Sequence, residues 1–281
     1  MTIKLIATDM DGTLLRTDKT FDYARFEDLL DQMDERGIKM VAASGNQVKQ
    51  LQAYFNPVNP DRLTYVSSNG AMVSDHNGVL YKRPVSKESL QRILNWNREN
   101  HAMMENLIVL SGTDAAYVSN HATPEMIELV SQFYVKVIQV EKFMEIDDDI
   151  LVIELVWPET ANVVEYIRAL RDVFGEELHT TGSGFGSVSI LAAGTTKETG
   201  LEALSRIWNI KPEEMAAFGD NGNDLEMLRY VGLPFVMPNA EDFMKVRIDN
   251  IALNDNEHNG VIDTMEAILA GAYDENGTMK R

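Results

Sequence analysis

Short apolar runs that each end in small polar residues recur near both ends of the chain. They cover residues 3–8, 38–43, 63–66, 215–218, 234–237 and 251–253. Runs of this length are too short for helices and are typical of strands buried on both faces. We therefore predict six short buried strands in these two parts of the chain.

Segments with helical spacing lie between most of these strands. One of them carries apolar side chains on a single face and ends at Gly37; these side chains are Phe26, Leu29, Leu30 and Met33. Strands that alternate with helices predict a doubly wound, parallel α/β sheet. In such sheets ligands bind beyond the carboxyl ends of the strands, which is where the polar clusters fall.

The middle of the chain has longer or more amphipathic strand candidates. They cover residues 107–110, 116–119, 135–140, 150–156 and 187–191. Two helices are expected among them, one from Pro124 with Thr123 as its N-cap and one over residues 159–174. We predict a smaller α/β domain at residues 84–191, inserted into a domain formed by residues 1–83 and 192–281.

Composition narrows the class of protein. The 281 residues include 44 acidic and 25 basic side chains, a net charge of −19, and 44% are hydrophobic, which can fill a sizeable core. Nucleic-acid and anionic membrane surfaces need clustered Lys and Arg, so we expect neither as a partner. The chain has no cysteine, which excludes disulfides and thiol chemistry. Without a signal peptide or a long apolar segment, a cytoplasmic protein is expected.

Two acidic clusters carry the strongest chemical signal. Asp9 and Asp11 follow the first strand, and two like charges so close repel unless a cation or a proton lies between them. Alone, this pattern also fits a turn or a helix N-cap. Asp220 and Asp224 follow another strand in the same way. Two acidic loops at one sheet edge suit Mg²⁺, which prefers carboxylates, waters and phosphate oxygens, and we predict it as the cofactor.

Two further segments could bind a phosphate. Residues 195–198 resemble a capping box with Thr195 as N-cap, which puts Lys197 in the first turn of a helix. The helix dipole disfavours a cation there, so the residue is either solvated or shared with an anionic ligand. Ser44 and Gly45 end the second strand with a hydroxyl and backbone N–H groups, although such pairs are also common in ordinary turns.

In order and placement, these segments resemble the four motifs of the haloacid dehalogenase (HAD) superfamily. The matching residues are 9–13, Ser44, Lys197 and 219–224. The block inserted after residues 68–71 is similar to the α/β cap of its Cof-type phosphatases, subclass IIB. The resemblance covers essentially the whole chain and implies a Rossmann-like core with an inserted cap domain.

This resemblance implies a Mg²⁺-dependent phosphatase for a small phosphorylated metabolite such as a sugar phosphate. Asp9 would be the nucleophile that takes the phosphoryl group, and Asp11 the general acid and base. The phosphate would be held by Ser44, Gly45, Lys197 and Asn223. The metal would be bound by Asp9, the main-chain carbonyl of Asp11 and Asp220, with Asp224 and Asn221 around it.

Three positions depart from the family pattern. Asn46 stands where arginine is common, Pro238 where glycine is usual, and Asn259 where an acidic residue is common. None is the presumed nucleophile, so they bear on substrate choice more than on chemistry. Two other functions use the same residues: a phosphotransferase or phosphomutase, and a non-catalytic protein that binds phosphoesters. We expect a monomer or a weak homodimer.

Overall fold

The computed structural model describes residues 2–100, 106–157, 163–182, 186–274 and 278–280. Contacts divide the chain into two compact units. The first, here called the core unit, consists of Met1–Ser44, Leu51–Tyr81 and Thr196–Arg281. The second, here called the inserted unit, consists of Gly45–Gln50 and Lys82–Thr195.

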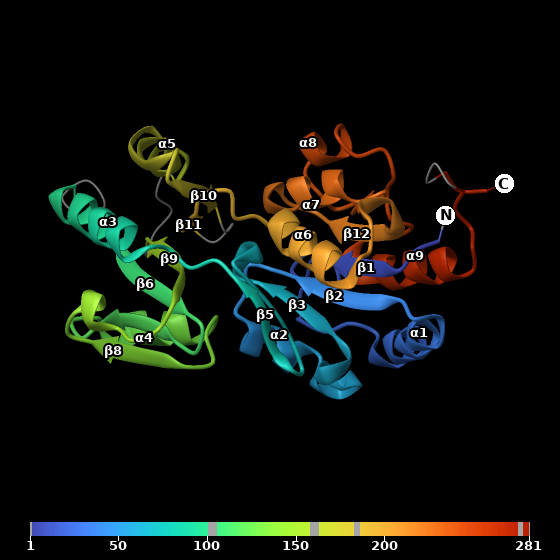
Figure 1. The fold of residues 1–281 in the computed structure, drawn as a ribbon, viewed down its shortest axis with the longest axis horizontal. Helices are drawn as coiled ribbons and strands as arrows, with labels where there is room; N and C mark the ends of the chain where they lie inside the picture. The colour runs from blue at the N-terminus through green and yellow to red at the C-terminus, as the bar shows by residue number, and fades with distance from the viewer. Residues whose placement is uncertain (1, 101–105, 158–162, 183–185, 275–277, 281) are drawn as a thin grey trace. The chain divides into compact units, whose positions relative to one another are not determined.

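The core unit is built on a seven-stranded sheet with the order β13-β12-β1-β2-β3-β4-β5 (Figure 1). Its five parallel strands are β1 (Leu5–Thr8), β2 (Lys39–Ala43), β3 (Thr64–Ser67), β12 (Met215–Gly219) and β13 (Leu233–Val236). Every residue of β1, β3 and β12 is buried, as the unbroken apolar runs indicate. The chain starts at the centre and winds outward in both directions, so the predicted doubly wound sheet is confirmed.

Two parts of this sheet differ from the prediction. β4 (Met72–Asp75), antiparallel to β3, and the mostly solvent-facing β5 (Gly78–Lys82) extend the edge, and no apolar run indicated them. The strand predicted at residues 251–253 is wrong, because only Ile251 forms an isolated bridge, with Val236. Ile251 and Leu253 are half exposed, so this segment lacks the two-sided burial of the other strands.

Helices cover both faces of the core sheet. α6 (Lys197–Trp208) and α7 (Leu225–Tyr230) pack together on one side, and α1 (Tyr23–Arg36) lies on the other and packs against α9 (Gly260–Leu269) (Figure 1). The predicted apolar face of α1 is buried, and Gly37 ends the helix in the left-handed conformation (φ 67°). Two shorter helices are α2 (Val48–Tyr54) and α8 (Asp242–Lys245).

The start of α6 lies one residue later than the capping box predicted. Thr196 is the N-cap, and its backbone N–H donates to Oγ1 of Thr199 at 3.1 Å. Thr195 belongs to the preceding turn, because its own N–H donates to the carbonyl of Ala192. Thr199 thus takes the part expected of Glu198, while Lys197 lies in the first turn as predicted and is its first residue.

The inserted unit has a six-stranded sheet with the order β10-β11-β9-β6-β7-β8. Its strands are β6 (Leu107–Gly112), β7 (Ala116–Ser119), β8 (Val137–Val140), β9 (Ile150–Val156), β10 (Leu178–Gly182) and β11 (Ser187–Ala192). α3 (Lys87–Glu99) and α5 (Val163–Phe174) pack on one face with Leu110, and α4 (Pro124–Ser131) packs on the other with Val109. α4 starts at Pro124 as predicted; the predicted start of the following helix, near residue 159, lies outside the described residues.

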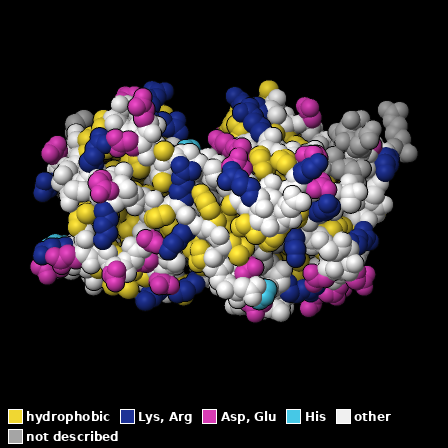
Figure 2. Space-filling model, in the orientation of Figure 1, with side chains coloured by type: hydrophobic (Ala, Val, Ile, Leu, Met, Phe, Trp, Pro, Cys, Tyr) yellow, Lys and Arg dark blue, Asp and Glu magenta, His cyan; other side chains and the backbone are white. Residues whose placement is uncertain are grey.

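The helices and the surface charges can be compared with what binding to a membrane or to nucleic acid requires. No helix within the described ranges is long and apolar enough to cross a membrane. On the face drawn in Figure 2, acidic and basic side chains of both units are interspersed. That face offers no broad basic field of the kind that binds nucleic acid.

Candidate active site

The carboxyl ends of β1 and β12 bring the two acidic loops together. These strands are neighbours with Thr8 opposite Phe218, and the N–H of Asp9 donates to the carbonyl of Phe218 at 3.0 Å. Asp9 is the first residue after β1, and Asp220 is the first residue after β12. Together with Asp224 they place one carboxylate oxygen each within 4.8 Å of one another. From β1 the chain continues to β2 on one side, and from β12 it continues to β13 on the other. Folds of this kind bind ligands where the strand order reverses in this way.

Lys197 lies among these carboxylates and is itself only 1% exposed. Its Nζ donates to Oδ1 of Asp9 at 2.5 Å and to Oδ1 of Asp224 at 2.6 Å. The cluster thus combines three carboxylates with one ammonium, so two negative charges remain uncompensated. A buried excess of that size needs protons or a divalent cation.

The pKa values of the cluster follow from burial and charge. Burial raises the pKa of Asp9 well above its usual range, and the negative charge of Asp224 adds to this effect. Burial, again with Asp224, raises the pKa of Asp220 to about 6. Burial alone would lower the pKa of Lys197, but Asp224 and Asp9 outweigh it, so this pKa is raised. The ammonium keeps its proton, and the carboxyls of Asp9 and Asp220 resist ionisation.

Gly12 and Thr13, which follow Asp11, lie against the carboxylate of Asp220. Thr13 donates from Oγ1 to Oδ1 of Asp220 at 2.9 Å. Gly12 has φ 78°, and a Cβ there would lie 2.6 Å from Oδ2 of Asp220. Only glycine combines this left-handed backbone with so close an approach. The sequence pattern contained Thr13, but its role was not predicted.

The side chain of Asp11 is engaged with another residue. Its Oδ1 accepts from Nζ of Lys19 at 2.5 Å, and Lys19 has a left-handed backbone (φ 64°). This lysine was not foreseen, because it lies in a loop whose path no periodicity indicates. Its ammonium leaves Asp11 ion-paired beside the cluster.

The residues expected to hold phosphate occupy neighbouring loops. Ser44 is 3% exposed and its N–H donates to the carbonyl of Val66, while the adjacent Gly45 is exposed. Asn223 donates from Nδ2 to Oδ1 of Asn69 at 3.0 Å. Asn69 was not predicted as a site residue, although it lies in a polar cluster at the end of β3.

Asp224 holds the loop at residues 219–224 in place. Its Oδ2 accepts from the backbone N–H groups of Asp220 and Asn221, both at 3.0 Å, while Oδ1 accepts from Lys197. Asn221 caps the short 3₁₀ helix Gly222–Asp224 by accepting from the N–H of Gly222 at 2.6 Å. Both oxygens of Asp224 are therefore used inside the protein.

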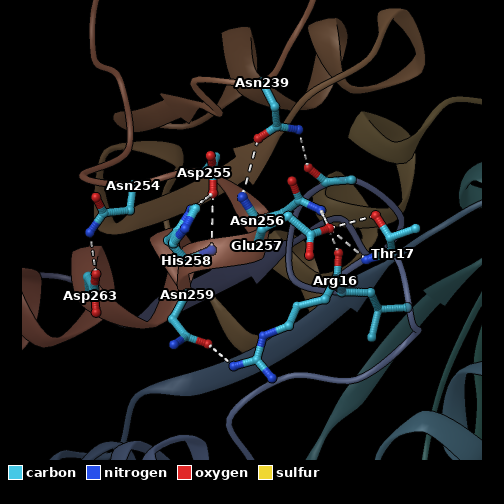
Figure 3. Close-up of polar contacts among 12 residues, drawn as sticks. Arg16, Thr17, Asn239, Asn254, Asp255, Asn256, Glu257, His258, Asn259 and Asp263 are labelled. Carbon is cyan, nitrogen blue, oxygen red and sulfur yellow. Dashed lines mark hydrogen bonds and ion pairs between the residues drawn. The ribbon is translucent and has the colours of Figure 1, made fainter.

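The loop that follows Asp11 is held by side chains from two C-terminal segments (Figure 3). Asn239 donates to the carbonyl of Gly12 at 2.7 Å, next to the Asp11–Gly12 peptide. Three further contacts are Asn256 to the carbonyl of Leu15, Arg16 to Oδ1 of Asn259, and Thr17 to Glu257. Asn259 thus keeps, as a neutral acceptor at 2.6 Å, the contact that a carboxylate would make with Arg16.

Comparisons with known proteins agree with this geometry. The sequence pattern of the haloacid dehalogenase-like hydrolases matches residues 6–265. The chain is 31% identical to the 5-amino-6-(5-phospho-D-ribitylamino)uracil phosphatase YbjI of Escherichia coli (strain K12), over 96% of this chain and 97% of that protein. It is 25% identical to the HMP-PP phosphatase of Klebsiella pneumoniae (strain 342), over 92% and 93% of the two chains.

A solved structure gives the same result. The crystal structure of SMU.1108c from Streptococcus mutans UA159 superposes with a TM-score of 0.87 and 31% identity, covering 96% of this chain and all of the other. The match therefore extends over both the core unit and the inserted unit. The chain belongs to the haloacid dehalogenase-like hydrolases, and within them it is a Cof-type phosphatase, a phosphomonoester hydrolase.

Proposed function

We propose that this phosphatase is Mg²⁺-dependent and transfers the phosphoryl group of a small metabolite to Asp9 before water releases it. The observation that supports the proposal most is the cluster of Asp9, Asp220, Asp224 and Lys197. Its oxygen donors and its two excess negative charges fit a hard divalent cation. Asp9, Asp220 and the main-chain carbonyl of Asp11 would hold Mg²⁺, which when bound neutralises charge on the phosphoryl oxygens.

The residues of the chain then divide the chemistry between them. A carboxylate oxygen of Asp9 attacks phosphorus while the bond to the ester oxygen breaks, and Asp11 gives that oxygen a proton. Asp11 next takes a proton from a water that attacks the same phosphorus, which releases inorganic phosphate and restores Asp9. Two displacements replace one difficult one.

Phosphate would be held by groups that follow two strands, β2 and β12, and by the first residue of one helix, α6. They are Ser44, Gly45, Lys197 and Asn223. Lys197 opens α6, where backbone N–H groups and the positive end of the helix dipole also favour an anion. For the substrate we propose a sugar or polyol phosphate, since the E. coli relative is named for a phosphate on a ribityl chain.

The proposal is tested by assaying phosphate release from a panel of phosphorylated metabolites. With Mg²⁺ we expect inorganic phosphate from sugar or polyol monoesters, and with EDTA we expect none. Asp9→Asn is predicted to abolish release while the protein stays folded, because it removes the nucleophile but keeps the shape. Undiminished release by Asp9→Asn would contradict the mechanism, and an isomeric ester in place of phosphate would indicate a phosphotransferase.

A further inference from the structure

A strained turn of the core unit lies beside the proposed phosphate site. Ser68, Asn69 and Gly70 follow β3, and all three have left-handed backbones, with φ of 52°, 52° and 93°. Ser68 is 1% and Asn69 7% exposed. Consecutive non-glycine residues in this conformation cost free energy and persist only where their surroundings hold them.

This turn, here called the Asn69 turn, contacts three of the segments expected to bind phosphate. The N–H of Asn69 donates to the carbonyl of Ser44 at 2.9 Å. Its side-chain Oδ1 accepts from Nδ2 of Asn223 at 3.0 Å. Gly70 packs so closely against the N-cap of α6 that a Cβ would lie 1.9 Å from the carbonyl oxygen of Thr196, the residue before Lys197.

We infer that Asn69 is a positioning residue for phosphoryl transfer: it fixes the Asn223 amide and ties the Ser44 loop to the start of α6. The inference rests on the proposed phosphate site. The residue type fits both demands, because asparagine tolerates a left-handed backbone and supplies an acceptor oxygen. Glycine would satisfy the backbone but leave the Asn223 amide without its partner.

Substitutions can separate the need for a left-handed backbone from the need for an acceptor oxygen. Asn69→Gly keeps the backbone conformation and removes the amide, and Asn223→Ala removes the donor from the other side. Asn209→Gly is the matched control, because Asn209 has the same left-handed backbone (φ 52°) at the exposed C-cap of α6. Inorganic phosphate is the binding probe, measured by calorimetry with saturating Mg²⁺, and p-nitrophenyl phosphate is the substrate.

We expect Asn69→Gly to weaken phosphate binding and to lower kcat/KM by about tenfold, the usual order for a lost hydrogen bond at an anion. The double variant Asn69→Gly/Asn223→Ala should have the same phosphate affinity and kcat/KM as Asn223→Ala. Each single substitution already removes the hydrogen bond between the two amides, so the second substitution removes nothing further. Asn209→Gly should match the wild type in both assays. Melting temperatures should agree within a few degrees across the set.

Three results would overturn the inference. They are wild-type phosphate affinity in Asn69→Gly, additive losses in the double variant, and loss of the folded state in Asn69→Gly, which would show that the amide serves folding instead. A wild-type protein that binds phosphate but releases none from esters would contradict only the proposed function. The comparison of binding constants would then still decide the role of Asn69.

Discussion

At the scale of single residues, the site is dominated by an excess of buried negative charge. Asp9, Asp220 and Asp224 share one ammonium, and burial raises the pKa of both Asp9 and Asp220. A carboxyl whose pKa is higher in the folded state than in the unfolded state binds its proton more tightly when folded. It therefore stabilises the fold at low pH, and this stabilisation is lost as the pH rises through the folded pKa.

For Asp220 this loss falls between the ordinary value of 3.8 and about 6. In EDTA, we expect the free energy of unfolding to decrease over this pH range, and Asp220→Asn to reduce the decrease. At pH 7 the variant should be more stable than the wild type by up to about 3 kcal/mol. Urea unfolding at a series of pH values measures both effects.

Mg²⁺ should remove most of this difference, because it supplies the missing positive charge to the wild type and is bound less well by Asp220→Asn. Asp28→Asn is a control, since Asp28 is an exposed carboxyl of α1 outside the cluster. A wild type whose stability in EDTA rises from pH 4 to pH 7 would be inconsistent with the charge excess.

Sequence and structure agree on single residues where a motif fixed the spacing. Asp9, Asp220 and Lys197 were singled out because each directly follows a strand or opens a helix, and these ends meet in the sheet. Lys19 and Asn69 were missed because their contacts depend on left-handed loop backbones, which leave no periodic signal.

At the scale of elements, the position of Lys197 depends on how closely α6 approaches the sheet. α6 packs on β3, and Gly200 lies on the same side of the helix as Lys197, one turn on. A Cβ at Gly200 would lie 2.4 Å from Cγ1 of Val66, which is fully buried. The absence of a side chain therefore sets the distance between the helix and the strand.

Gly200→Ala is predicted to destabilise the protein by about 1–3 kcal/mol, the usual cost of overpacking, although alanine is ordinarily the better helix former. It should also lower kcat/KM, since a displaced α6 moves Lys197 away from Asp9. Thermal unfolding and phosphate release measure the two effects. In a Val66→Ala background the same substitution should cost less; an equal cost in both backgrounds would rule out the contact as its cause.

Predictions of elements succeeded for strands that are unbroken apolar runs and failed for strands that are not. The apolar runs at residues 3–8 and 215–218 predicted β1 (Leu5–Thr8) and β12 (Met215–Gly219), each to within two residues at either end. β5, at the edge of the sheet, is exposed or half-exposed along its length, and β4 is buried over Met72–Ser74 but turns polar after two apolar residues, so neither strand carries such a run. The shift of the α6 N-cap from Thr195 to Thr196 turned on a single hydrogen bond, which adjacent threonines do not encode.

At the scale of the whole molecule, a chain of net charge −19 binds an anionic substrate. Long-range repulsion of a phosphate is then expected, so attraction must come from a few groups at short range. The core unit offers Lys197, the N-terminus of α6 and an acidic cluster that could hold a cation. The class of the chain could be read from its motifs, whereas the substrate could not, because no motif covers the side chains of the inserted unit.

The most direct test of the account is to look for the phosphoryl group on Asp9. Single turnovers of a ³²P-labelled substrate with Mg²⁺, quenched in acid after milliseconds, should yield protein-bound label in the peptide that contains Asp9. Asp9→Asn should yield none. Asp11→Asn, which lacks the acid of the first displacement and the base of the second, should gain label more slowly and retain it longer. Phosphate released at the wild-type rate with no label on the protein at any time would show that water attacks the substrate directly, and would contradict the account.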